Sequence, residues 1–111
     1  MRYPLEERLR HFAVQIILFT KSLPYDVAMK ELIRQVVRSA GSIGANYVES
    51  NEAVSKKDFM LHLRIARKES RETEFWLSIL GDLNNSGEIR VLQDEARQFS
   101  RILSAIIKKS E

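Results

Sequence analysis

Two sets of polar side chains in this 111-residue sequence recur at helical intervals. Members of the first set are spaced by four, four and three residues, which places them in one stripe along a helix. An antiparallel return of the next helix would bring Glu69 level with Arg38 and place Glu72 in the same strip. Carboxylates arranged in this way can act as general acid and base, and they can also form ion pairs that fix how two helices align. The stripe consists of Arg38, Ser42, Asn46 and Glu49.

These carboxylates lack the companions that catalysis requires. The sequence contains no cysteine, no phosphate-binding loop, no dinucleotide fingerprint and no serine elbow, and its two histidines have no metal-ligand spacing. We therefore predict no catalytic residue, metal site or cofactor, and a protein that is not an enzyme. An enzyme that uses Glu49, Glu69 and Glu72 is the alternative, and it would need perturbed carboxylates in a cleft. The predicted polar network, either structural or ligand-binding, comprises Arg38, Asn46, Glu49, Asp58, Glu69 and Glu72.

The second set is basic. Between Lys56 and Arg71, six basic residues face two acidic ones, although the net charge of the chain is only +3. Stripes of this kind on neighbouring helices would merge into a cationic face that binds phosphate backbones by releasing counterions, and a solvated charged face is the alternative. Aromatic residues for base stacking are not interleaved with the stripes. The predicted nucleic-acid-binding residues are Arg64, Arg67, Lys68 and Arg71, with Arg90, Arg97 and Arg101 near the C-terminus.

Four helices are needed to hold these side chains in place. Apolar residues recur at steps of three and four in the segments 5–23, 29–47, 59–80 and 89–106. Pro24, a break at 51–54 and a turn at 84–87 separate the segments, and Asp26 and Ser55 are predicted N-caps. No strand-like alternation competes with this pattern. The sequence therefore predicts an all-α fold, an up-down-up-down antiparallel four-helix bundle, as a single domain over residues 1–111.

The second predicted helix is more apolar than a surface helix needs to be. Its apolar arc, from Leu32 to Val48, is nearly 180° wide where about 100° suffices. This excess predicts a homo-oligomer. Gly41 and Gly44 at the edge of the arc each cost about 1 kcal/mol of helix propensity, which close helix packing, a hinge or the approach of a ligand would explain. Further apolar residues outside the seam of the third helix are Ile65, Trp76 and Ile79.

Composition indicates where such a protein works. Hydrophobic residues make up 44% and charged residues 30% of the chain, too apolar for a disordered protein and too charged for a membrane protein. The longest apolar stretch, 12–19, falls far short of the ~20 residues that span a bilayer. The N-terminus lacks the apolar core of a signal peptide. We predict a cytoplasmic protein without a membrane partner.

Two ordered motifs resemble the signature of the four-helix bundle proteins first noted as reading frames within 23S ribosomal RNA intervening sequences. They are RSAGSIGANYVE at 38–49, followed by SKKDF at 55–59, and ARKESRETEFWL at 66–77. The resemblance covers most of the chain. The motif positions are Arg38, Ala45, Asn46, Glu49, Ser55, Asp58, Phe59, Glu69, Glu72 and Trp76.

This resemblance implies a compact helical bundle, often a ring-like homo-oligomer such as a pentamer, with no demonstrated catalytic chemistry. The architecture is also similar to that of accessory proteins of diversity-generating retroelements, which are basic pentameric barrels that bind nucleic acid and a reverse transcriptase. We therefore predict a non-enzymatic, oligomeric bundle that binds RNA or DNA through the basic face of its third and fourth helices. The alternative is a protein-interaction scaffold that binds a protein partner through apolar helix faces.

Overall fold

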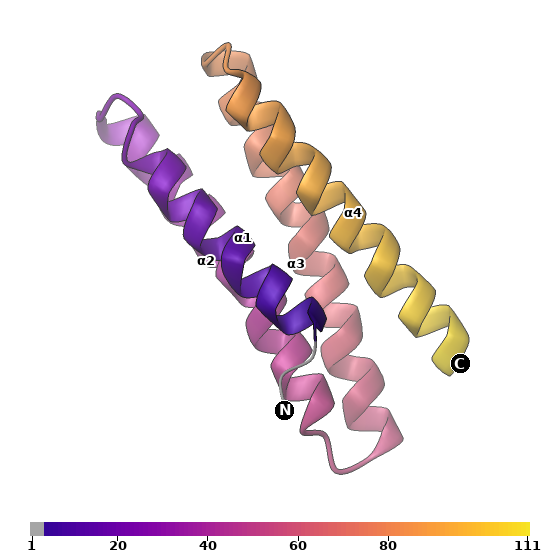
Figure 1. Ribbon diagram of the computed structural model, residues 1–111. Coiled ribbons are helices and arrows are strands. Elements are labelled where there is room, and N and C mark those ends of the chain that lie inside the picture. Colours follow the sequence, from indigo (N-terminus) through magenta and orange to yellow (C-terminus); the bar gives the residue numbers. More distant parts are fainter. Residues whose placement is uncertain (1–3) are drawn as a thin grey trace.

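Four helices form an antiparallel bundle of 44 × 23 × 19 Å in the computed structural model, which describes residues 4–111. Successive helices run in opposite directions, and the turns alternate between the two ends of the bundle (Figure 1). No strand occurs in the described range. The predicted all-α, up-down-up-down arrangement is confirmed. The helices are α1 (Pro4–Thr20), α2 (Val27–Asn51), α3 (Lys56–Leu83) and α4 (Gly87–Ser110).

Side-chain caps determine where three of the helices begin. Asp26 caps α2 and Ser55 caps α3, as predicted, and each side chain accepts a hydrogen bond from the backbone N–H three residues later, over 2.7 and 3.1 Å. Ser86 caps α4 by accepting a hydrogen bond from the N–H of Glu88. The predicted turn at 84–87 is therefore one residue shorter, because Gly87 is already helical.

The first helix is shorter than the apolar pattern predicts. It ends at Thr20 rather than near Leu23. The backbone N–H groups of Ser22 and Leu23 donate to carbonyls three residues back, as in a tightened final turn. The Ser22 hydroxyl also donates to the Phe19 carbonyl, so hydroxyl groups satisfy backbone acceptors that a longer helix would have used.

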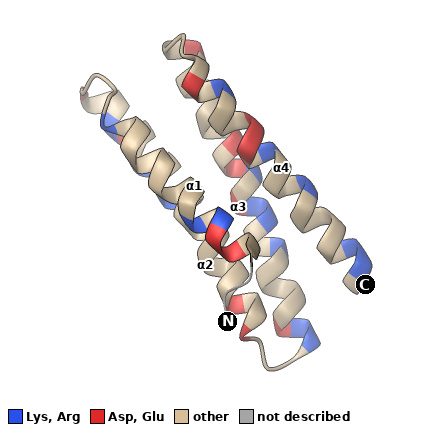
Figure 2. Ribbon diagram, viewed as in Figure 1, with Lys and Arg blue, Asp and Glu red and all other residues tan. Residues whose placement is uncertain are grey.

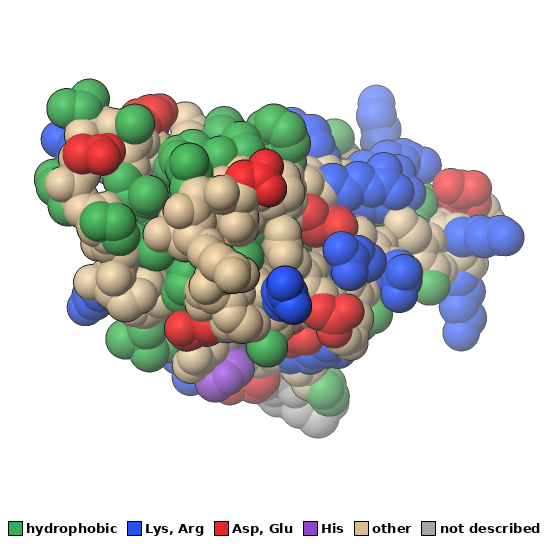
Figure 3. All heavy atoms as spheres, turned by 90° about the horizontal axis from the view of Figure 1, so that it is seen from above, with side chains coloured by type: hydrophobic (Ala, Val, Ile, Leu, Met, Phe, Trp, Pro, Cys, Tyr) green, Lys and Arg blue, Asp and Glu red, His purple; other side chains and the backbone are tan. Residues whose placement is uncertain are grey.

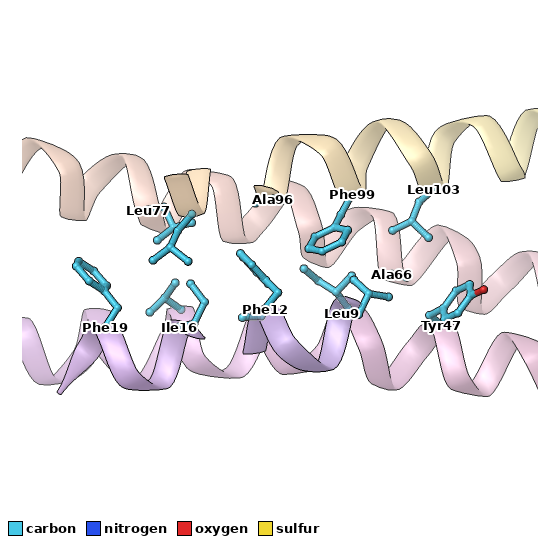
Figure 4. Close-up of a cluster of buried hydrophobic side chains, with 14 of the residues drawn as sticks. Leu9, Phe12, Ile16, Phe19, Tyr47, Ala66, Leu77, Ala96, Phe99 and Leu103 are labelled. Carbon is cyan, nitrogen blue, oxygen red and sulfur yellow. The ribbon is translucent and has the colours of Figure 1, made fainter. Parts of the chain in front are cut away.

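Apolar side chains from all four helices meet in one continuous core (Figure 4). Phe12 and Phe99 pack edge to face, with ring centroids 5.2 Å apart, and join α1 to α4. Met60 and Ile107 are buried where the pattern places Phe59 and Ile106, both of which are half-buried. Adjacent residues at the edge of a helical seam are both partly covered. In each of these two pairs the more deeply buried residue therefore lies one position later than the pattern predicts.

The wide apolar arc of α2 is mostly covered within the chain. Leu32 and Ile33 are half-buried and pack against the core, and Val36 is fully buried. At the other edge, Val48 is 39% exposed. The width arises because α2 packs against both α1 and α3. The apolar residues that remain exposed lie mainly on the outer faces of α1 and α3.

The contact of α1 with α4 is slight compared with its packing along α2, and Arg8 is central to it. Its guanidinium donates to both carboxylate oxygens of Glu95, over 2.9 and 2.6 Å, and to Gln98, and it lies over the Phe99 ring. Hydrogen bonds to Glu95 raise the pKa of the Arg8 guanidinium. This cluster connects the first helix of the bundle to the last.

The two glycines of α2 differ in their surroundings. A Cβ added at Gly44 would lie 3.4 Å from the Cβ of Leu9, so this glycine permits the close approach of α1. A Cβ added at Gly41 would meet nothing within 4 Å. Close helix packing therefore explains Gly44 and leaves Gly41 without a packing role in one chain.

Substituting each glycine by alanine tests this difference. We expect Gly41→Ala to raise the free energy of unfolding by up to about 1 kcal/mol, because it gains helix propensity without a steric cost. Gly44→Ala gains the same propensity, but its methyl group would lie 3.4 Å from the Cβ of Leu9, at the short limit of van der Waals contact, so we expect a smaller gain or none. Chemical denaturation followed by circular dichroism measures both. A larger gain for Gly44→Ala would contradict the packing interpretation.

Candidate functional site

The predicted contact between Arg38 and the glutamates of α3 is present. Arg38 Nη1 lies 3.3 Å from Glu69 Oε2, and Nη2 forms an ion pair with Glu72 Oε1. The same Glu72 oxygen accepts a hydrogen bond from Trp76 Nε1 over 3.2 Å. Glu69 is 6% exposed, whereas the Arg38 side chain is 44% exposed. A buried carboxylate on α3 is thus neutralised by an arginine that reaches over from α2.

Hydroxyl groups continue this polar contact into the interior. The Thr73 hydroxyl lies 2.9 Å from the Ser39 hydroxyl, and both residues are completely buried between α2 and α3. Buried polar groups are costly unless they pair, so both helices must keep this alignment. The layer formed by Arg38, Glu69, Ser39 and Thr73 fixes the register of α2 against α3.

The remaining members of the predicted network do not join this layer. Asn46 donates to the Ser42 carbonyl, and its Oδ1 lies 3.2 Å from His62 Nδ1. His62 Nε2 lies 3.4 Å from Asp58 Oδ1, which makes a second, separate chain of contacts between α2 and α3. Glu49 is exposed, and its carboxylate has no hydrogen bond or ion pair within residues 4–111. His62 is the member that sequence analysis missed, although it follows Asp58 by one helical turn.

Neither chain of contacts contains a cluster of side chains that could hold a metal ion. No group of three His, Asp or Glu side chains able to hold a metal ion gathers within residues 4–111. Arg38 donates to one carboxylate oxygen of Glu69, and Arg38 and Trp76 both donate to one oxygen of Glu72. Both chains of contacts connect α2 to α3 and fix how the two helices align.

Polar groups also align α3 with α4. The hydroxyls of Ser70 and Ser100 lie 2.7 Å apart, and Ser100 donates to Glu74 Oε2 over 2.6 Å. Arg97 Nε lies 3.9 Å from the other carboxylate oxygen of Glu74. These contacts hold the C-terminal half of α4 level with the first half of α3.

This alignment creates a shallow groove between α3 and α4 with a volume of about 380 Å³. Arg71 enters its lining from α3, and Arg97 and Arg101 enter from α4, together with Glu74, Ser100 and Ser104. We call this feature the α3–α4 groove. Three of the seven predicted nucleic-acid-binding residues therefore come together from two helices.

The other four predicted residues take different places. Arg64 and Arg67 continue the stripe of Arg71 toward the start of α3, at intervals of three and four residues. At about 100° per residue, Lys68 falls on the outer face of α3, opposite Ser70. Arg90 lines a separate pocket at the α3–α4 turn, next to Asp82 and Asn84.

Charge is segregated along the bundle around the groove. Residues 97–110 contain four basic and no acidic side chains, whereas residues 72–96 contain six acidic side chains and one basic side chain. The basic residues follow the lower half of α3 and α4, and the acidic ones the upper half (Figure 2). Basic side chains crowd one side of the molecule as viewed from above (Figure 3). The folded chain thus concentrates positive charge that its net charge of +3 conceals.

None of the helices within residues 4–111 is long and apolar enough to cross a membrane.

Known proteins share this sequence pattern and fold. The model of a family described as "23S rRNA-intervening sequence protein" matches residues 5–105. The 1.70 Å crystal structure of a protein of unknown function from the S23 ribosomal protein family of Bacteroides thetaiotaomicron VPI-5482 is similar, with 31% identity and a TM-score of 0.82. That match covers 93% of this chain and 97% of the other. No curated protein matches the chain.

Replacing Arg38 by alanine tests the role of the polar layer. The substitution leaves the buried Glu69 carboxylate without its counter-charge, and we expect the free energy of unfolding to fall by about 1–3 kcal/mol. Thermal denaturation should show a clearly lower midpoint. Arg34→Ala is the matched control. The ion pair of Arg34 with Glu31 lies on the exposed face of α2, so its loss should leave the midpoint nearly unchanged. Equal denaturation midpoints for the two variants would show that Arg38 has no structural role.

Proposed function

Because the chain belongs to the 23S rRNA-intervening sequence protein family, we propose that it is a non-enzymatic, self-associating bundle that binds RNA. The observation that carries the proposal is the α3–α4 groove, where arginines from two helices line one surface. A solvated charged face would need no such convergence.

The groove suits a phosphate backbone better than bases. Arg71 and Arg101 are exposed and have no ion pair within residues 4–111, so their guanidinium groups are available to phosphate oxygens. Arg97 is held loosely between Glu74 and Asp94, 3.9 Å from each. Base stacking has little support, because no aromatic side chain lines the groove. We therefore expect little sequence preference, since phosphate contacts position a nucleic acid without reading its bases.

Self-association is the second part of the proposal. Several large apolar side chains remain exposed on the folded chain, among them Leu61 at 51% and Phe75 at 58%. A homo-oligomer would cover such surface, and it would repeat the cationic groove several times, which strengthens the attraction for a polyanion. The pentameric ring implied by the family resemblance is one such assembly.

A protein-interaction scaffold is the alternative function, and the same exposed apolar side chains favour it. The dependence on salt separates the two. Binding to a phosphate backbone weakens steeply as salt rises, because counterions are released, whereas an apolar interface is insensitive to salt.

Reversing two groove charges tests RNA binding. We expect the parent protein to bind labelled single- and double-stranded RNA at low salt. The logarithm of the association constant falls as the logarithm of the salt concentration rises. In the variant R71E/R101E this slope should become less steep by about 1.4 to 1.8 units, because each lost phosphate contact removes about 0.7 to 0.9. Fluorescence anisotropy titrations at several salt concentrations measure the slope.

The control variant K21E/K30E makes the same change of charge at two exposed positions near the α1–α2 turn, which are not part of the groove lining. It should retain most of the parent slope. Circular dichroism must show equal helicity for all three proteins. Undiminished binding by R71E/R101E would place the RNA site outside the groove, and absence of binding by the parent at low salt would favour the scaffold.

A further inference from the structure

Two rows of basic side chains extend the α3–α4 groove toward the C-terminal end of the bundle. Their members are spaced by three, four or seven residues, intervals that return to the same side of a helix, so each row runs along its helix axis. Five of the six residues are exposed, and Arg67 is half-buried. We call the two rows together the basic track. It consists of Arg64, Arg67 and Arg71 on α3 and of Arg97, Arg101 and Lys108 on α4.

Antiparallel packing places the two rows of the basic track at the same levels. The contact between the hydroxyls of Ser70 and Ser100 sets the register of the two helices. At 1.5 Å per residue, two pairs of basic residues are then level to within about 3 Å. They are Arg71 with Arg101, directly beside this contact, and Arg64 with Lys108, about 9–12 Å further toward the start of α3 and the end of α4.

No carboxylate separates the charges of these two pairs. Residues 59–68 and 97–110 contain no acidic side chain, and none of the four paired residues has an ion pair within residues 4–111. Like charges at one level repel each other, so an anion between the rows would lower the energy of both. The axes of packed helices lie about 8–10 Å apart. Long basic side chains from both rows therefore reach one backbone that lies between them.

Acidic side chains close the basic track at its other end. Arg97 lies 3.9 Å from Glu74 on α3 and 3.9 Å from Asp94 on its own helix. Beyond this point the upper halves of α3 and α4 are mainly acidic and would repel a phosphate backbone (Figure 2). The track from Arg97 to Lys108 spans eleven positions, or about 16 Å along the helix axis.

We infer that the basic track binds a single nucleic-acid strand, which lies lengthwise between α3 and α4. This inference rests on the proposed RNA binding and names the form of the nucleic acid. A base-paired helix with the dimensions of DNA turns once in about 34–36 Å, so over the length of the track each of its strands winds nearly halfway round the axis. A straight track thus contacts a duplex at only a few phosphates, whereas a flexible single strand can follow both rows.

The salt dependence of binding distinguishes the two forms. Five of the six basic residues have no ion pair in the described range, because only Arg97 is held by carboxylates. At about 0.7 units for each phosphate contact, a single strand that meets all five should give a slope of about −3.5. A duplex that meets two or three residues should give about −1.8 to −2.7, at about 0.9 units each. We therefore expect the steeper slope for the single strand.

Anisotropy titrations at several salt concentrations measure these slopes for three labelled probes. The probes are a uridine oligoribonucleotide longer than the basic track, a thymidine oligodeoxynucleotide of the same length, and an RNA duplex of the same length. The two single strands should share the steeper slope, because their phosphates are the same. A duplex slope as steep as that of the uridine strand would overturn the inference. A shallower slope for the DNA strand would contradict binding through the phosphate backbone alone.

Reversing the charges farthest from the acidic end tests whether the strand runs along the whole track. In the variant R64E/K108E the slope for the uridine strand should become less steep by about 1.4 units, because two contacts are lost. The neutral variant R64Q/K108Q loses the same two contacts, and it provides the measurement if charge reversal lowers the helicity. The control variant K21E/K30E should retain most of the parent slope.

The outcomes separate this inference from the proposed function. If both variants at positions 64 and 108 keep the parent slope while R71E/R101E loses part of it, the strand does not follow the basic track. RNA binding in the α3–α4 groove would then stand without the lengthwise single strand. A parent protein that binds none of the three probes at low salt would contradict RNA binding itself.

Discussion

A carboxylate buried between α2 and α3 sets the alignment of the bundle. Glu69 is almost completely covered, and Arg38 supplies its counter-charge from the neighbouring helix. Moving either helix by one turn would strand the charge in the interior, at a cost that far exceeds that of an exposed ion pair. The hydroxyl pair of Ser39 and Thr73 adds the same requirement one layer deeper. The rotation of α3 about its axis follows from these contacts.

That rotation decides what each side of α3 does. With Glu69 toward α2, the flank that carries Ser70, Arg71 and Glu74 faces α4, where Ser100 completes the polar contact. Arginines from both helices then line one groove, although each helix alone shows only a charged stripe. The outer face is left with apolar residues that no helix of the same chain covers. The groove and the exposed apolar face are thus two consequences of one alignment.

Charge and apolar surface are separated for a physical reason. A phosphate-binding groove must stay hydrated and accessible, whereas a surface that pairs with another copy must exclude water. In the proposed function, RNA and a second copy would bind to different surfaces, so that an assembly of bundles of modest net charge would present the basic groove more than once. The acidic residues along 72–96 keep positive charge away from the opposite end of α3 and α4.

Local sequence alone determined the four helices, two of the caps and most of the core, because helical periodicity and capping act between residues a few positions apart. It also paired Arg38 with the glutamates of α3, since an antiparallel turn fixes which positions are level. Only the tertiary structure separated Arg90 from the other arginines, divided the polar network into two chains and placed His62 in one of them. It also showed that α1 and α3 cover most of the α2 arc. These features depend on how far each helix is rotated toward its neighbours, and the packing of the whole core sets that rotation.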